Sequence, residues 1–162
     1  MVPAVISITK DFPMTQRLDH HSAAPAGMKA LGGVHGYLAQ TDLAKSLIDL
    51  VFLRTSQLNG CAYCIDMHSR DLLKSGLSVD KLMLVPAWRE AGALFSEKEQ
   101  AALAWTESVT LVAQTGIPDA EFTAVRAAFS EKEVADLTIA IGLMNAYNRI
   151  GVGFRLTPVA AK

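Results

Sequence analysis

The sequence predicts an all-α, oligomeric protein with one domain of about six to seven helices. Three observations carry this prediction. No segment alternates apolar and polar residues over the length of a strand. From Ser22 onward, apolar residues recur at helical spacing in one segment after another. Only 19% of the 162 residues are charged, whereas a typical soluble domain has about 25%. This deficit indicates that further copies of the chain cover some of the apolar surface.

The charge balance and hydropathy exclude several classes of protein. Fifteen Lys and Arg residues stand against sixteen Asp and Glu residues, so the chain lacks the basic excess of a nucleic-acid binder. A hydrophobic content of 51% argues against disorder. No export signal is evident, and no apolar run reaches the roughly 20 residues of a membrane span. We therefore expect a cytoplasmic protein that binds neither nucleic acid nor a membrane.

The chain divides into an arm and a helical domain. Residues 1–20 contain Pro3 and Pro13 and lack a helical period, so we expect an extended N-terminal arm. Residues 21–158 are expected to form the single domain. Pro25 suits the first turn of the opening helix, because proline has no N–H to lose there.

The next three helices are delimited by turn signals. Thr41 or Asp42 is expected to cap the second helix, and Asn59-Gly60 should end it because glycine adopts the left-handed turn readily. Ser75-Gly76 should end the third. The predicted helices cover residues 42–58, 61–74 and a segment from about 78, with a kink or restart at Pro86.

Two near-copies of one start signal, Phe-Ser-Glu-Lys-Glu, open the later helices. Each places Ser96 or Ser130 at the cap and a glutamate three residues later, which is a capping box. A short helix that opens at Pro118-Asp119 lies between them. The predicted ranges are 97–114, 118–129 and 131–154.

The chemically informative residues surround the start of the third helix. Cys61 and Cys64 are three positions apart in its first turn, so their Cα atoms should lie about 5–6 Å apart, within reach of a disulfide. The helix N-terminus favours thiolate over thiol. His68 follows on the same face and can exchange a proton with a thiol. Asp49, on the preceding helix, could orient the imidazole if the two helices form a hairpin.

Two other interpretations of this cluster remain open. Cys61, Cys64 and His68 could bind zinc, with Asp49 or His35 as a fourth ligand, although structural zinc sites usually draw on two separated ligand pairs. Alternatively, both cysteines could be inert buried residues that pack as small apolar side chains. The second interpretation leaves the spacing of His68 unexplained.

Other polar residues have weaker signals. His35 lies on the apolar stripe of the first helix, where we expect a hydrogen-bonded core histidine. His20 and His21 lie at the end of the arm, where we expect solvated side chains. Asn145 and Asn148 place amides in an apolar helix, where they could form interhelical hydrogen bonds or a subunit contact; we favour the contact.

Residues 49–68 resemble the carboxymuconolactone decarboxylase superfamily, on its alkylhydroperoxidase AhpD-like side, and the resemblance extends more loosely over residues 20–155. In that group a carboxylate precedes the first cysteine by twelve positions, and a histidine follows the second by four. Asp49, Cys61, Cys64 and His68 match these positions. The segment Asn145-Ala-Tyr-Asn-Arg149 also resembles the family.

The resemblance implies an AhpD-like helical bundle, assembled as a trimer or hexamer, with thiol-dependent peroxidase activity. Cys64 would attack the hydroperoxide and Cys61 would resolve it as a disulfide, with His68 and Asp49 as the proton relay. A dithiol or lipoylated protein would be the reductant, and no cofactor or metal is implied. The helix dipole alone favours Cys61 as the more acidic thiol, whereas the family and the spacing of His68 favour Cys64, which we follow.

Two features qualify this assignment. The carboxylate is usually glutamate in that group, and the shorter Asp49 would need a bridging water to reach His68. Within the superfamily, lactone decarboxylation by a catabolic enzyme is the alternative function, although that branch typically lacks the cysteine pair. A non-catalytic metal-binding oligomer is the second alternative.

Overall fold

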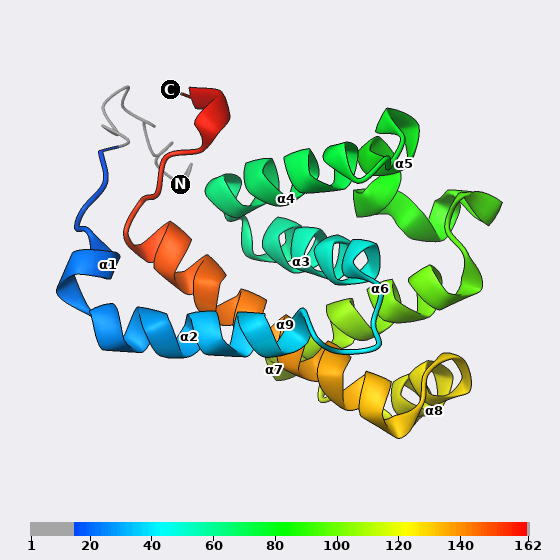
Figure 1. Ribbon diagram of the computed structural model, residues 1–162. Helices are drawn as coiled ribbons and strands as arrows, with labels where there is room; N and C mark the ends of the chain where they lie inside the picture. Colours follow the sequence, from blue (N-terminus) through cyan, green and yellow to red (C-terminus); the bar gives the residue numbers. More distant parts are fainter. Residues whose placement is uncertain (1–14, 162) are drawn as a thin grey trace, which may run out of the picture.

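The computed structural model describes residues 15–161, which are helical and contain no strand (Figure 1). The all-α prediction is therefore confirmed. Seven helices have six or more residues, and α1 and α7 are single turns. Residues 1–14 of the predicted arm lie outside the described part of the chain. The helices are α1 (His20–Ala23), α2 (Pro25–Leu38), α3 (Lys45–Asn59), α4 (Ala62–Lys74), α5 (Val79–Leu84), α6 (Glu97–Thr110), α7 (Val112–Thr115), α8 (Asp119–Ala128) and α9 (Glu131–Gly153).

Helix α3 lies at the centre of the fold. It packs against α4, α6 and α9, and Figure 1 shows it enclosed by its neighbours. Because it is covered on most sides, apolar residues occupy nearly every position between Leu47 and Leu53. The few polar residues in its buried stretch are therefore candidates for a structural or chemical role. They are Asp49, Thr55 and Ser56.

The local start signals predict the later helices well. Ser96 and Ser130 each accept a hydrogen bond from the backbone N–H three residues later, and each capping glutamate bonds back to the serine N–H. Both capping boxes are thus confirmed. Pro86 also acts as predicted: α5 ends at Leu84, and a 3-10 segment, Val85–Glu90, continues the chain.

The predicted start of the second helix is wrong. Helix α3 begins at Lys45, and its cap residue, Ala44, makes no side-chain hydrogen bond. Thr41 instead donates its hydroxyl to the carbonyl of Leu38, at the end of the preceding helix. The side chain expected to open one helix therefore closes another.

The two asparagines of α9 bond within the chain. Asn148 is 1% exposed and donates to the hydroxyl of Ser56, 3.0 Å away. Asn59 donates to both Asn145 and Asn148, at 3.0 Å each. The subunit contact favoured for Asn148 is therefore wrong, because these amides tie α9 to α3 inside one chain.

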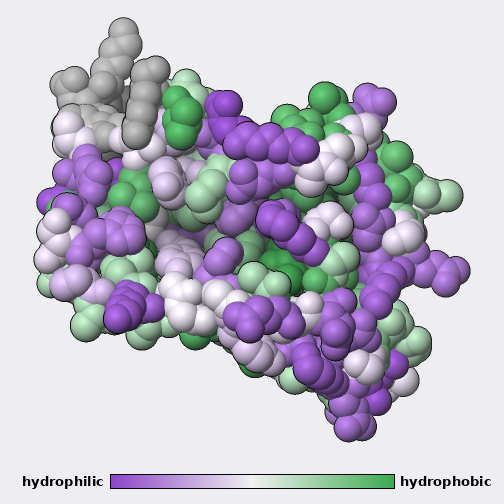
Figure 2. All heavy atoms as spheres, in the orientation of Figure 1, coloured by the Kyte–Doolittle hydropathy of each residue, from purple (hydrophilic) through white to green (hydrophobic). Residues whose placement is uncertain are grey.

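The described end of the arm is attached to the end of α9. The N–H of Arg17 donates to the carbonyl of Phe154, and its guanidinium donates to that of Gly153, each at 2.9 Å. None of the helices within residues 15–161 is both long and apolar enough to cross a membrane. Figure 2 shows apolar side chains gathered at the upper right, over α5, where Val79 and Met83 are exposed.

Candidate functional site

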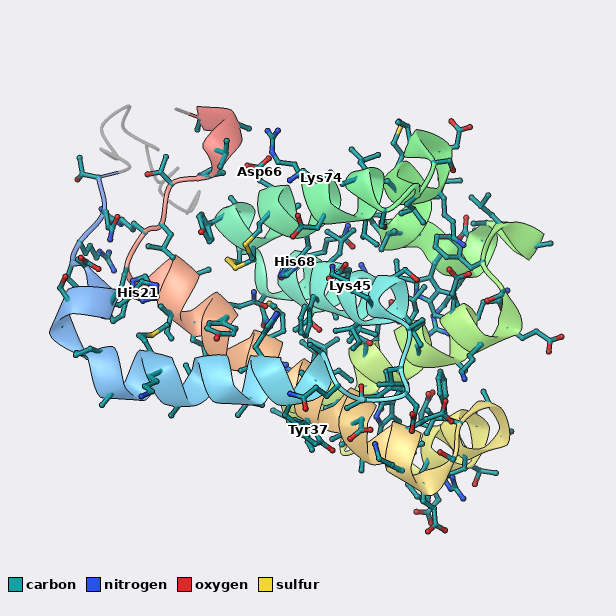
Figure 3. The ribbon with its side chains drawn as sticks, in the orientation of Figure 1. His21, Tyr37, Lys45, Asp66, His68 and Lys74 are labelled. Carbon is teal, nitrogen blue, oxygen red and sulfur yellow. A yellow bond between two sulfur atoms is a disulfide. The ribbon has the colours of Figure 1, made fainter. Side chains whose placement is uncertain are left out.

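The two cysteines lie where α3 turns into α4. Gly60 takes the left-handed conformation with φ 67°, and the N–H of Cys61 bonds to the carbonyl of Ser56. Cys61 is then the cap of α4, and its sulfur accepts from the N–H of Cys64 at 3.4 Å. The two sulfurs form a disulfide, with Cα atoms 5.3 Å apart, as the spacing predicts (Figure 3).

The disulfide rests on the backbone of α9. Gly151 is the residue at the contact, and a Cβ built there would lie 2.8 Å from the sulfur of Cys61 and 3.4 Å from that of Cys64. Real Cβ atoms essentially never approach another atom within 3.0 Å. The absence of a side chain at this position therefore makes room for the sulfur pair.

His68 lies one turn after Cys64 and is buried, with 4% of the residue exposed. Its ring centroid is 5.1 Å from that of Phe52. Burial lowers the pKa of His68 from 6.5 to about 4, and the nearby carboxylates of Asp49 and Asp71 oppose this shift only in part. The imidazole is consequently neutral at pH 7, and one of its two ring nitrogens can accept a proton.

Asp49 is close enough to act on His68 electrostatically, but it does not bond to it. The carboxylate is 6% exposed and forms an ion pair with Lys45, four residues earlier on the same helix. Neither ring nitrogen of His68 has a hydrogen-bond partner among the described residues. The proposed relay between Asp49 and His68 thus stays a prediction, and it requires a movement or a bridging water.

A cavity of about 880 Å³ opens beside the disulfide. Cys64 and His68 line it, whereas Cys61 lies behind its wall, 1% exposed. The wall combines α2, α4 and α9 with the described end of the arm, and it is mainly apolar and aromatic. Its larger apolar and aromatic residues are Leu18, Met28, Tyr63, Met67, Met144, Tyr147, Ile150 and Leu156.

Three further histidines line this cavity, and their sequence positions alone do not place them there. His35 is exposed and faces the cavity rather than the core, so the expected core histidine is wrong. His20 and His21 are the first two residues of α1, and Nδ1 of His20 is buried without a hydrogen-bond partner among the described residues. The only available signal was the helical spacing of His35 from Met28 and Gly32, which share its face of α2.

The cavity wall has little fixed charge. None of the described lining residues is lysine or arginine. Asp19 is the one carboxylate, and its side chain accepts hydrogen bonds from the N–H groups of His21 and Ser22 at the start of α1. Among the described lining residues, an anionic ligand would therefore find no lysine or arginine to pair with.

The residues proposed as zinc ligands do not form a metal site here. No group of three or more His, Cys, Asp and Glu side chains in residues 15–161 is arranged to hold an ion. Each sulfur is bonded to the other, so neither is available as a thiolate ligand in this state.

Comparisons with known proteins agree with the resemblance seen in the motif. The carboxymuconolactone decarboxylase family profile matches residues 25–108, a range that includes the disulfide and His68. An uncharacterized Bacillus subtilis protein, YdfG, is 35% identical over 139 residues, covering 86% of this chain and 94% of its own.

Solved structures share the fold. A protein of unknown function from Agrobacterium tumefaciens, described as a candidate antioxidant defence protein AhpD, has a TM-score of 0.85 and 40% identity, covering 89% of this chain and 98% of its own. A peroxidase-related protein with an alkylhydroperoxidase AhpD core, from Ralstonia eutropha, has a TM-score of 0.74 and 21% identity, covering 85% and 73%.

Proposed function

Because this chain belongs to the carboxymuconolactone decarboxylase family, on its AhpD-like side, we propose that it is a thiol-dependent peroxidase that reduces hydroperoxides through Cys61 and Cys64. One observation carries the proposal. The disulfide between Cys61 and Cys64, at the start of α4, lies at the wall of a mainly apolar cavity and beside a buried neutral histidine. This arrangement supplies a nucleophile, a partner thiol, a proton acceptor and space for an organic substrate.

The location of each sulfur supports Cys64 as the nucleophile. Cys64 lines the cavity, whereas Cys61 is packed against α9 at Gly151. His68 is one helical turn from Cys64 on the same face of α4. A hydroperoxide in the cavity therefore meets Cys64 first, and Cys61 is placed to react with it afterwards.

The proposed reaction has three steps: oxidation of Cys64, closure of the disulfide and reduction of the disulfide. His68 takes the proton of the Cys64 thiol, and the thiolate attacks the peroxide oxygen, breaking the O–O bond. Cys64 becomes a sulfenic acid, and the leaving alkoxide takes the proton from His68 to become an alcohol. The Cys61 thiol attacks the Cys64 sulfur, which closes the disulfide and releases water. An external dithiol reopens the disulfide and is itself oxidised.

The charge of the cavity argues against the catabolic alternative. A carboxylated lactone is an anion, and burying its carboxylate without a permanently charged cation beside it is costly. The described lining offers histidines and tyrosines but no lysine or arginine. A neutral organic hydroperoxide suits this wall better.

The reductant and the assembly belong to the same proposal. Both sulfurs are buried, so we expect a small dithiol or a lipoyl group on a flexible arm to reach Cys64 through the cavity. We also expect a homo-oligomer, trimer or hexamer, in which exposed apolar side chains such as Met83 and Phe122 are covered.

Two cysteine variants test the proposed activity. Cumene hydroperoxide consumption is followed with dihydrolipoamide as the reductant. Cys64→Ser should reduce the rate to background, because the nucleophile is gone. Cys61→Ser is the matched comparison: without reductant, it should consume one equivalent of peroxide and leave a sulfenic acid on Cys64 that dimedone labels. Turnover by Cys64→Ser at the wild-type rate would refute the proposal.

A further inference from the structure

The buried carboxylate near His68 is held by a lysine that reaches in from solvent. Asp49 is 6% exposed, and its ion-pair partner is Lys45, the first residue of α3. The side chain of Lys45 is 78% exposed. Figure 3 labels Lys45 and His68 close together in its view, and the charge of Lys45 acts on His68. The ammonium can therefore leave the carboxylate for water with little change in the surrounding packing.

His68 is surrounded by charged and titratable groups from three helices. Asp49 and Lys45 act on it from α3, Asp71 acts from its own helix α4, and His35 acts from α2. The two carboxylates favour the protonated imidazole, whereas Lys45 and His35 disfavour it. Each of these carboxylates has a lysine partner: Asp49 pairs with Lys45, and Asp71 pairs with Lys74 at 3.7 Å. Asp49 is the buried one of the two.

We propose that Lys45 is a positioning residue that occupies the Asp49 carboxylate while His68 is neutral and releases it when His68 takes up a proton. This inference deepens the proposed function and rests on it only for the catalytic consequence. Neither nitrogen of His68 has a partner among the described residues, so the ring is free to pair with a released Asp49.

The physical reason is that one buried carboxylate must be compensated at every stage. An unpaired charge below the surface is costly, so Asp49 needs a cation even when the imidazole is neutral. When the Cys64 thiolate is then consumed by its attack on the peroxide, the imidazolium left at His68 is buried and needs an anion that stays in place. If His68 replaces Lys45 as the partner of Asp49, the carboxylate keeps a cation and the imidazolium gains an anion. When His68 returns the proton to the alkoxide, Lys45 pairs with Asp49 again.

The test is a titration of His68 by NMR in the disulfide form of the whole protein, which requires no turnover. His68→Gln assigns the resonance among the four histidines. In Lys45→Met, the freed carboxylate should raise the pKa of His68 by about one unit. Lys45→Arg should restore the wild-type value, because it keeps the cation.

The chain offers a matched control in Lys132→Met. Lys132 and Asp136 form an equivalent pair on α9, four residues apart, with an exposed lysine and a carboxylate that is 2% exposed. The other partner of Asp136 is the hydroxyl of Tyr37, on α2. Lys132→Met should leave the titration of His68 unchanged. An equal shift in both lysine variants would refute the proposal.

A second background shows whether Lys45 acts through Asp49. In Asp49→Asn, the further change Lys45→Met should move the pKa of His68 much less than it does in the wild-type background. Equal shifts in both backgrounds would mean that Lys45 acts only by its own charge, and no shift in either would mean that it does not act at all. Both results would overturn the proposal. Because the titration is independent of peroxide, an inactive protein that titrates as expected would refute the proposed function alone.

Discussion

A methyl group at position 151 should make the Cys61–Cys64 disulfide easier to reduce. The Cβ introduced by Gly151→Ala would lie 2.8 Å from the sulfur of Cys61. To restore ordinary contact, sulfur and backbone must separate by roughly half an ångström. In the disulfide, the bond to Cys64 restrains the Cys61 sulfur, whereas in the dithiol form the sulfur can rotate away.

The magnitude follows from the cost of overpacking. Adding a methyl group to a filled site typically costs about 1–3 kcal/mol. If most of this cost falls on the oxidised form, the reduction potential rises by about 20–65 mV, since about 30 mV corresponds to 1.4 kcal/mol for two electrons. The oxidised protein should also unfold at a lower temperature, while the reduced protein should change little.

The assay is a redox titration against a dithiothreitol buffer, with melting curves of both forms. Gly142→Ala is the matched control, because Gly142 is an exposed residue of the same helix, and its Cβ would meet nothing within 4 Å. That variant should stabilise both forms by up to about 1 kcal/mol and leave the potential unchanged. If the two alanine variants had the same potential, the reasoning from the Gly151 contact would be wrong.

Two further predictions concern the cavity wall and the buried histidine. Arg17→Ala removes the guanidinium bond to Gly153 and should loosen the arm, although its backbone bond to Phe154 remains. We expect kcat/KM for cumene hydroperoxide to fall about fivefold, as for the loss of about 1 kcal/mol, and hydrogen peroxide turnover to stay nearly unchanged. Equal losses with both peroxides would contradict a role of the arm in forming the cavity. Because burial lowers the pKa of His68 to about 4, its contribution to stability is complete above pH 6.5 and is lost as the pH falls toward 4, by about 3 kcal/mol. Urea unfolding at pH 7 and pH 4 should therefore show a weaker acid dependence for His68→Gln than for the wild type, and an unchanged dependence would contradict the assignment.

Features encoded within a few residues were predictable from the sequence. The capping boxes at Ser96 and Ser130 need only a serine and a glutamate three positions apart. The separation of Cys61 and Cys64 follows from helix geometry, and the observed Cα distance of 5.3 Å agrees with it. The same geometry places His68 on their face of the helix.

Features that depend on distant contacts were not predictable. Helical periodicity correctly placed His35 on one face of its helix, but it could not show that this face borders a cavity instead of the core. The arm reaches the cavity because Arg17 bonds to Gly153, 136 positions away, which no local signal encodes. By contrast, the ion pair of Asp49 with Lys45, four residues earlier on the same helix, is local and could have been expected from the spacing.

The near absence of fixed charge in the cavity wall has a consequence for catalysis. The described lining residues include no lysine or arginine that could stabilise a thiolate at Cys64. The thiolate must therefore be stabilised by the N-terminus of α4 and by the imidazolium that forms when His68 takes the proton. With His68 neutral and buried, the thiolate and the imidazolium form together and disappear together. The net charge of the site is then the same before and after proton transfer, which limits the cost of charge separation in a low-dielectric cavity.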